Sequence, residues 1–318
     1  MYPLFRKVSA SLTVQDERVY TNLNTLIKLQ FRAKAFSLMP NQPINSTLNG
    51  RHGSKIRGRG LNFEELRHYH PGDDIRTLDW KVTNRTKKPH VRLFTEERQR
   101  NVILLIDQRI SMFFASQNKM KSVVASEIAA LLAWNVIAAG DQVGAVIFND
   151  KKIITLPPKQ NRASLIRLLS QIVNINNALQ VGQVPKATQL NTALKVAHRC
   201  ARSDTLIICI SDGFGWTDES SNWVHLLSKH NETIGVTIFD ECELYLPQLK
   251  NMVITDGSQQ ISISTFDKKL RHRFTQSYIH QSEVMQRAFK KVGAPLISIS
   301  TDKDTSWQLT KALGGIHA

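Results

Sequence analysis

From residue 101 onward, short apolar runs alternate with longer segments of helical periodicity. Residues 102–106 are continuously apolar and end at Asp107, which is typical of a strand buried on both faces of a parallel sheet. Further strands are predicted over 142–148, 152–156, 205–210, 233–239 and 296–300, with a hairpin near 252–264. Helices are predicted over 119–139, 162–175, 190–200, 220–229, 268–292 and 306–313. This alternation predicts an α/β fold with a doubly wound, mostly parallel sheet and helices on both of its faces.

The first hundred residues have a different pattern. Residues 20–39 show the 3.6-residue period of a basic amphipathic helix, and Pro40 and Pro43 end it. Such a helix could lie on an anionic membrane surface, but packing against its own protein is favoured. Residues 50–60 form a Gly- and Arg-rich loop, and a strong turn signal follows over 70–74.

A hairpin is predicted next, with strands over 79–84 and 90–95 around the polar connection 85–89. The chain thus divides into three parts. They are an N-terminal helix region over 1–49, a small β module over 50–100 and a single α/β domain over 101–318.

Composition and charge narrow the choice of partners. The 318 residues are 42% hydrophobic and 21% charged, which excludes a disordered chain. The net charge is +16, and residues 1–100 carry 19 Lys and Arg against 9 Asp and Glu. Such an excess favours nucleic acid, anionic membranes or acidic protein surfaces as partners.

The cysteines and the apolar runs bear on localisation. Three cysteines without a metal-ligand spacing fit a reducing compartment. The N-terminus has no signal-peptide pattern, and the longest apolar run, 128–139, is shorter than the roughly 20 residues of a spanning helix. A soluble, cytoplasmic protein is therefore expected.

Oxygen-bearing side chains gather at one predicted edge of the sheet. Asp107 and Asp212 follow two strands, and Ser111 and Thr188 lie in neighbouring loops. Carboxylates and hydroxyls at the carboxyl ends of parallel strands could hold Mg²⁺. Alternatively, each residue caps the helix that follows it.

These residues carry a resemblance to a known family. Asp107-x-x-x-Ser111, Thr188 and Ser211-Asp212-Gly213 resemble the von Willebrand factor A domain, in which DxSxS, a threonine and a second aspartate form a metal-ion-dependent adhesion site. The preceding segment resembles the bacterial DUF58 family. Its motif reads Arg59-Gly60-x-x-Phe63, Leu66-Arg67-x-Tyr69-x-Pro71-Gly72-Asp73-Asp74-x-Arg76-x-x-Asp79-Trp80 and Glu96-Glu97. The resemblance implies a von Willebrand A-like domain that acts as an adaptor or chaperone partner of a MoxR-type AAA+ ATPase.

One residue departs from the adhesion-site motif, because Arg109 stands where the family has its first serine. A guanidinium only donates hydrogen bonds and stays charged, so it cannot ligate a cation. Arg109 either turns outward and leaves a weakened site, or pairs with Asp107 or Asp212 in place of the metal, and the second alternative is favoured. We expect poor Mg²⁺ binding, restored by Arg109→Ser.

The motif before the α/β domain also holds charged residues in a short span. Arg67, Arg76, Asp73, Asp74 and Asp79 are expected to form a buried ion-pair network, with Tyr69 and Trp80 packed over it. These residues are also candidates for partner binding. The basic loop over 50–60 could engage phosphates or an acidic partner, although a solvated loop is favoured.

No enzyme motif of the forms GxSxG, HExxH or GxGxxG is present, so no catalytic activity is expected. The leading hypothesis is a cytoplasmic protein-interaction module that binds an acidic or carboxylate-bearing partner, a MoxR-type AAA+ ATPase. One alternative is nucleic-acid binding through the basic first hundred residues, against which the interleaved acidic residues count. A metal-dependent phosphohydrolase is the remaining alternative.

Overall fold

The computed structural model describes residues 16–36, 38, 61–96, 99–245, 252–255, 260–263 and 266–314. The chain divides into two compact units, one formed by residues 1–40 together with 100–318, the other by residues 41–99. The N-terminal segment, predicted as a region of its own, thus groups with the α/β domain. The Gly- and Arg-rich segment 50–60, the prolines at 40 and 43 and Glu97 lie outside the described residues.

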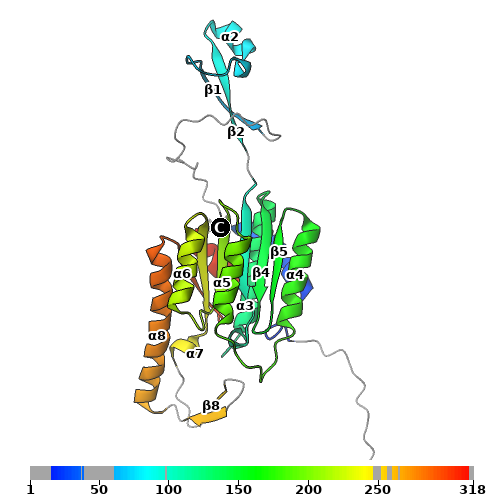
Figure 1. The fold of residues 1–318 in the computed structure, drawn as a ribbon. Coiled ribbons are helices and arrows are strands. Elements are labelled where there is room, and N and C mark those ends of the chain that lie inside the picture. Colours follow the sequence, from blue (N-terminus) through cyan, green and yellow to red (C-terminus); the bar gives the residue numbers. More distant parts are fainter. Residues whose placement is uncertain are drawn as a thin grey trace, which may run out of the picture. The chain divides into compact units, whose positions relative to one another are not determined.

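A six-stranded sheet forms the centre of the larger unit (Figure 1). Its strands are β3 (Asn101–Asp107), β4 (Gln142–Phe148), β5 (Ile153–Lys159), β6 (Leu206–Ser211), β7 (Glu232–Phe239) and β10 (Leu296–Ser300). The order is β10-β7-β6-β3-β4-β5, and all neighbours are parallel except the edge strand β5. The order reverses direction at β3, as in doubly wound sheets, so the predicted fold class is confirmed.

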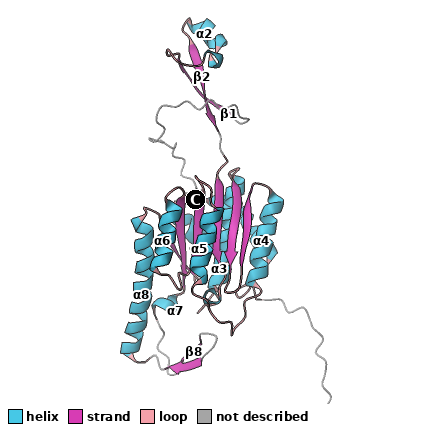
Figure 2. Ribbon diagram, viewed as in Figure 1, coloured by secondary structure: helices cyan, strands magenta, loops and turns pink. Residues whose placement is uncertain are grey.

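Helices cover both faces of this sheet (Figure 2). One face packs against α3 (Lys121–Ala138), α4 (Arg162–Asn176) and α9 (Thr305–Ala312). The other packs against α5 (Gln189–Cys200), α6 (Asp218–Ser228) and α8 (Lys268–Lys291). Alternate residues of β3 enter the two cores, which explains why positions 102–106 of that strand are all apolar.

The predicted strands and helices of the α/β domain are present with ends shifted by at most three residues. The predicted hairpin consists of β8 (Met252–Thr255) and β9 (Gln260–Ile263). The short helix α7 (Glu241–Leu244), which follows β7, was not predicted.

Helix α3 is predominantly apolar and is buried along most of its length. Among the described residues it is the one helix long and apolar enough to cross a membrane, with a mean hydropathy of 1.4, and 83% of it is buried within the protein. A predominantly apolar helix is typical of a domain core as well as of a membrane span.

The N-terminal segment packs against α3. Among the described residues of the predicted helix 20–39, only α1 (Leu23–Lys28) is α-helical, and two single 3₁₀ turns follow, η1 (Leu29–Phe31) and η2 (Ala33–Ala35). Leu26 is fully buried in the α3 core, and Asn135 Nδ2 donates to the Ala33 and Phe36 carbonyls at 2.9 and 2.6 Å. These bonds engage carbonyls that a continuing helix would use itself. The apolar face of this segment therefore packs on its own protein, the favoured alternative.

The smaller unit contains an antiparallel pair, β1 (Leu61–His68) and β2 (His90–Glu96). Between them lie the 3₁₀ turn η3 (Ile75–Thr77) and α2 (Trp80–Thr86). The predicted strand over 79–84 is wrong, since these residues begin a helix. The helix begins here because the Asp79 side chain accepts hydrogen bonds from the backbone N–H groups of Lys81 and Val82 and so caps the first turn.

Candidate functional site

Three neighbouring strands end in aspartates at the same edge of the sheet. Asp107 closes β3, and Asp212 and Asp240 follow β6 and β7 directly. Asp107 is fully buried and accepts a hydrogen bond from Ser211 Oγ at 2.7 Å. The first two carboxylates thus come together as the sequence predicts, because the carboxyl ends of adjacent parallel strands share one edge.

Arg109 folds back onto Asp107. Its Nη2 donates to Asp107 Oδ2 at 2.6 Å, and its Nε lies 3.0 and 3.1 Å from the two carboxylate oxygens. The same Nη2 lies 3.8 Å from Asp212 Oδ1. The side chain is 1% exposed and its guanidinium lies 5.5 Å from the centre of the Phe148 ring. The geometry is that of the favoured alternative, in which Arg109 pairs with the carboxylate instead of turning outward.

A second cation at the site was missed by the sequence analysis. Lys121, the first residue of α3, is 3% exposed and places Nζ 3.0 Å from Asp212 Oδ2. The same Nζ lies 2.5 Å from Glu243 Oε1 in α7. Lys121 is separated from Asp212 by 91 positions, and no motif connects the two residues.

The electrostatics of the site follow from burial and these pairs. Burial raises the pKa of Asp107, and the charge of Arg109 opposes that rise. Burial also disfavours the charge of Lys121, yet the carboxylates of Asp212 and Glu243 outweigh it and raise the Lys121 pKa. For Asp212, burial acts to raise the pKa, but Lys121 and Arg109 lower it overall. Lys121 and Asp212 are therefore a charged pair at neutral pH.

The donor set does not fit a divalent cation. The carboxylate of Asp107 is engaged by Arg109 and Ser211, and that of Asp212 by Lys121. The described part of the chain holds no cluster of three or more His, Cys, Asp or Glu side chains with metal-site geometry. A cation at this edge would have to displace two buried positive charges.

The two hydroxyl residues predicted as ligands have different surroundings. The Ser111 hydroxyl is buried and has no hydrogen-bond partner among the described residues. Thr188 is exposed at the N-terminus of α5, and its side chain makes no capping hydrogen bond. Ser111 is therefore the buried hydroxyl of this pair that lacks a hydrogen-bond partner among the described residues, and Thr188 faces solvent.

A pocket of about 510 Å³ opens beside these residues. Its polar lining includes Lys121, Asp212, Glu243 and Ser111. Much of its apolar lining comes from the loop after β3, the loop after β6 and α8, including Phe113, Phe114, Phe214, Phe274, Tyr278 and Met285. Apolar walls around a few polar groups are the usual composition of a binding pocket.

Asp240 connects loops from three strands at this edge. Its Oδ2 accepts from the backbone N–H of Ser116 at 2.9 Å and from the Thr301 hydroxyl at 2.7 Å. Its Oδ1 accepts from the Cys242 N–H at 3.0 Å, which caps α7. The sequence signal for it was the aspartate directly after a strand, the same signal that identified Asp107.

Replacing Asp240 with asparagine is expected to lower the free energy of unfolding by about 1–3 kcal/mol at pH 6, because charge-assisted bonds are lost. Burial acts to raise the Asp240 pKa, but the bonds from Ser116 and Thr301 outweigh it and lower that pKa. The contribution of Asp240 is thus present above the ordinary aspartate pKa and is lost as pH falls through the lowered value. Urea unfolding should show that the difference between wild type and Asp240→Asn shrinks from pH 6 to pH 2.5.

Glu283→Gln, at an exposed position of α8, is the control for that experiment. It makes the same change of carboxylate to amide and should leave the urea midpoint nearly unchanged at pH 6. A constant difference between Asp240→Asn and wild type at all pH values would contradict the assignment.

In the smaller unit the predicted ion-pair network is only partly present. Arg67 Nη2 lies 2.8 Å from Asp73 Oδ1, and Arg92 Nε lies 2.9 Å from Asp79 Oδ2. The bond from Arg92 is the main cause that lowers the pKa of Asp79. The pairs are separate, and Arg92 was not among the predicted members.

The other predicted members lie at the surface. Asp74 is exposed and accepts from the Arg76 N–H, which caps η3, and Arg76 is exposed too. Trp80 is 63% exposed, so the predicted packing of Trp80 over a buried network is wrong. Its position at the start of α2, directly after the buried cap Asp79, directs it to solvent. Tyr69 is half-buried, and its backbone N–H donates to the Pro89 carbonyl.

The chain is similar in sequence to known proteins and resembles several solved structures. The chain is 28% identical over 283 residues to the uncharacterized protein Rv1480 of Mycobacterium tuberculosis, covering 87% of this chain and 86% of that protein. Similar solved structures include the hypothetical protein BatB from Bacteroides thetaiotaomicron, 13% identical over 68% of this chain and 100% of that chain, with a TM-score of 0.38. The VWA domain of SpRpn10 is 10% identical over 70% of this chain and 100% of that chain, with a TM-score of 0.39.

Because both TM-scores are below 0.5, the fold is assigned from the strand order and strand directions of this chain alone. The family comparison is more direct. The family model described as "Protein of unknown function DUF58" matches residues 65–284, which is more than half of the sequence. The chain therefore belongs to the DUF58 family.

Proposed function

We propose that this chain is a non-enzymatic protein-interaction module that holds its partner in the pocket beside Asp212 and needs no bound metal ion. The observation that carries the proposal is the aromatic lining of that pocket. Phe114 is 39% exposed, and Phe214 and Phe274 are each 40% exposed, so three phenylalanines present apolar surface around one opening. Clustered, partly exposed aromatic residues are typical of the central part of protein interfaces.

The charges of the site favour an apolar side chain of the partner, and not a carboxylate, as the group that enters the pocket. Arg109 and Lys121 are 1% and 3% exposed and are already paired with Asp107 and Asp212. A partner's carboxylate would therefore have to break a buried ion pair before it reached either cation. An apolar side chain of the partner fits the pocket without that penalty, and a polar group beside it can bond the Ser111 hydroxyl.

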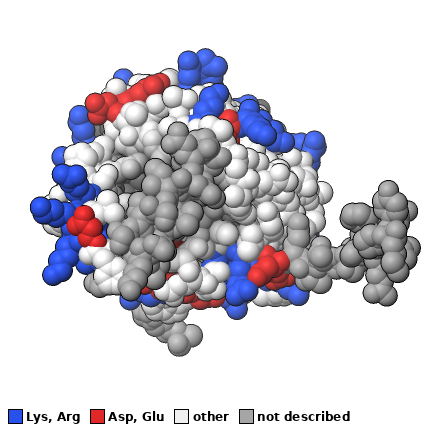
Figure 3. All heavy atoms as spheres, turned by 90° about the horizontal axis from the view of Figure 1, so that it is seen from below, with Lys and Arg blue, Asp and Glu red and all other residues white. Residues whose placement is uncertain are grey.

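The surrounding surface favours a protein over a nucleic acid. Seen from below, Lys and Arg side chains on the visible part of this face lie in separate groups with Asp and Glu among them (Figure 3). Nucleic-acid sites instead gather basic residues on one continuous surface. We therefore retain a MoxR-type AAA+ ATPase, the partner class that the family resemblance implies, as the proposed partner.

Phe214→Asp is expected to weaken capture of that ATPase at least tenfold, because a charge replaces an apolar contact in the pocket. The measurement is a pull-down of the MoxR-type ATPase of the same organism by the full-length tagged chain, followed by titration of the purified pair. Trp307→Asp is the matched control, since Trp307 is a 54% exposed aromatic on α9 that does not line the pocket. Equal capture by wild type and Phe214→Asp would remove this pocket from the proposal.

A further inference from the structure

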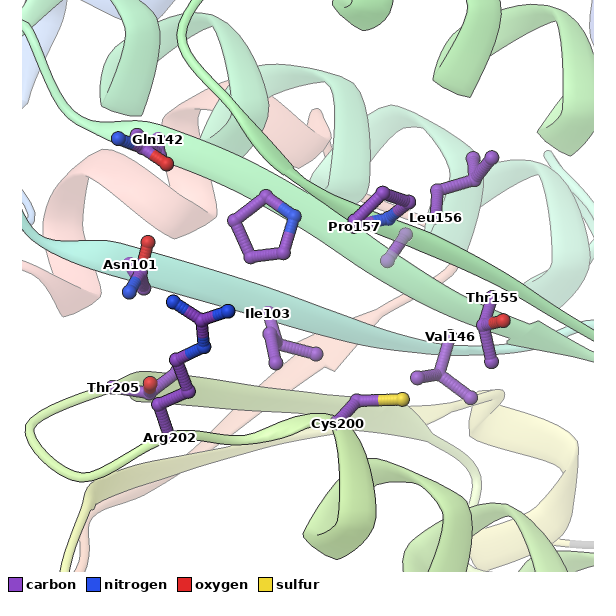
Figure 4. Close-up of a pocket in the computed structure, with 12 residues that line it drawn as sticks. Asn101, Ile103, Gln142, Val146, Thr155, Leu156, Pro157, Cys200, Arg202 and Thr205 are labelled. Carbon is purple, nitrogen blue, oxygen red and sulfur yellow. The ribbon is translucent and has the colours of Figure 1, made fainter.

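A second pocket lies at the opposite ends of the strands. Asn101 and Gln142 begin β3 and β4 and are partners in the sheet register, and Thr205 directly precedes β6. Together with Cys200 and Arg202, which lie at and beyond the end of α5, they line a pocket of about 330 Å³ (Figure 4). It is distinct from the pocket beside Asp212, which lies at the carboxyl ends of the strands.

The floor and one wall of this pocket are apolar. Ile103 and Val146 lie in the sheet, and Pro157 and Pro158 of β5 stand beside them. The pairing of β5 shifts register opposite Gly144, where an added Cβ would lie 2.6 Å from the Leu156 carbonyl oxygen. The absent side chain at Gly144 lets the β5 backbone approach β4 closely and brings the two prolines to the pocket.

Two polar groups in the pocket have no bonding partner in the part of the chain that the structure describes. Thr205 is 1% exposed, and its hydroxyl is buried without a hydrogen bond. Buried polar atoms nearly always have a partner, so an unpaired hydroxyl in a pocket points to a missing one. Arg202 is exposed, forms no ion pair with any described residue, and extends its guanidinium toward Asn101 (Figure 4).

We propose that this pocket binds a small aliphatic carboxylate. The guanidinium of Arg202 matches the two oxygens of a carboxylate, and the Thr205 hydroxyl donates to the same group. An alkyl chain then covers the apolar surface of Ile103, Val146 and the prolines. At roughly 30 Å³ for each water-sized group, a volume of about 330 Å³ holds about eleven such groups, so a carboxylate with an alkyl chain of five carbons fits.

Cys200 provides the readout, because it is the exposed cysteine of the chain and lines the pocket. Cys209 is buried and Cys242 is half-buried, so the full-length Cys242→Ser protein reports on Cys200. Hexanoate is expected to slow the reaction of Cys200 with N-ethylmaleimide at least fivefold at saturation. Acetate lacks the chain and hexanamide lacks the charge, and each should protect at least tenfold less well at equal concentration.

Two variants test the assigned contacts, each measured against its own rate without hexanoate and by calorimetry. Arg202→Gln should weaken hexanoate binding about tenfold or more, whereas Arg199→Gln, on the last turn of α5 and outside the pocket lining, should not. Thr205→Val should also weaken binding, yet raise the urea midpoint of the free protein, because it removes an unpaired buried hydroxyl. This combination separates a binding role from simple damage to the fold.

The proposal is overturned if hexanoate does not protect Cys200, if acetate or hexanamide protects it equally well, or if Arg202→Gln binds hexanoate as wild type does. None of these results depends on the partner proposed for the pocket beside Asp212.

Discussion

Arg109→Met is expected to lower the free energy of unfolding by about 3–5 kcal/mol, because it leaves the Asp107 carboxylate buried without its countercharge. Both side chains are at most 1% exposed, so solvent cannot replace the lost partner. The measurement is urea unfolding of the full chain followed by circular dichroism. Arg162→Met serves as control, because Arg162 is exposed over the Trp134 ring and should contribute less than about 1 kcal/mol.

The double variant Arg109→Met/Asp107→Leu keeps that prediction testable if the single variant does not fold. It replaces the buried pair with apolar side chains, so it should recover most of the lost stability. A double variant as unstable as Arg109→Met would show that the Arg109–Asp107 pair is not the reason for the loss.

Mg²⁺ binding should appear only when both buried cations are removed. Wild type, Arg109→Ser and Lys121→Ala are expected to give no heat of binding at millimolar Mg²⁺ in calorimetry, whereas Arg109→Ser/Lys121→Ala should bind with millimolar affinity or better. The sequence alone predicts that Arg109→Ser restores Mg²⁺ binding. That single change is insufficient because Lys121 Nζ still lies 3.0 Å from the Asp212 carboxylate. Freed carboxylates and the Ser111 hydroxyl are oxygen ligands that suit Mg²⁺.

Adding Asp212→Ala to the double variant is the control and should abolish the regained binding. Mg²⁺ binding by Arg109→Ser alone would show that Lys121 does not block the site.

The sheet and the Arg109–Asp107 pair could be predicted because both depend on local sequence. Continuous apolar runs identify buried parallel strands, and an arginine two positions after a strand-ending aspartate lies within reach of it. The position of Lys121 depends instead on how α3 packs across the sheet edge and on α7, a four-residue helix without a periodic pattern. Contacts of that kind are set by tertiary packing.

The wrong strand prediction over 79–84 also has a physical reason, because specific contacts there outweigh the propensity of single residues. Trp80 and Val82 favour strands by propensity, but Asp79 is a preferred N-terminal cap and its carboxylate binds two backbone N–H groups of the first turn. The signal was present in the sequence as Asp79, which lies directly before the helical residues. Propensity over so few residues is weak compared with capping and with the Arg92 contact that holds the cap in place.

Asp240 makes two distant loops mechanically dependent on each other. One carboxylate oxygen holds both the Ser116 backbone, between β3 and α3, and the Thr301 hydroxyl, after the edge strand β10. If the β3–α3 loop moves further than a hydrogen bond can stretch, either that contact breaks or the loop after β10 moves as well. The loop that contributes Phe113 and Phe114 to the pocket is thereby coupled to the far edge of the sheet.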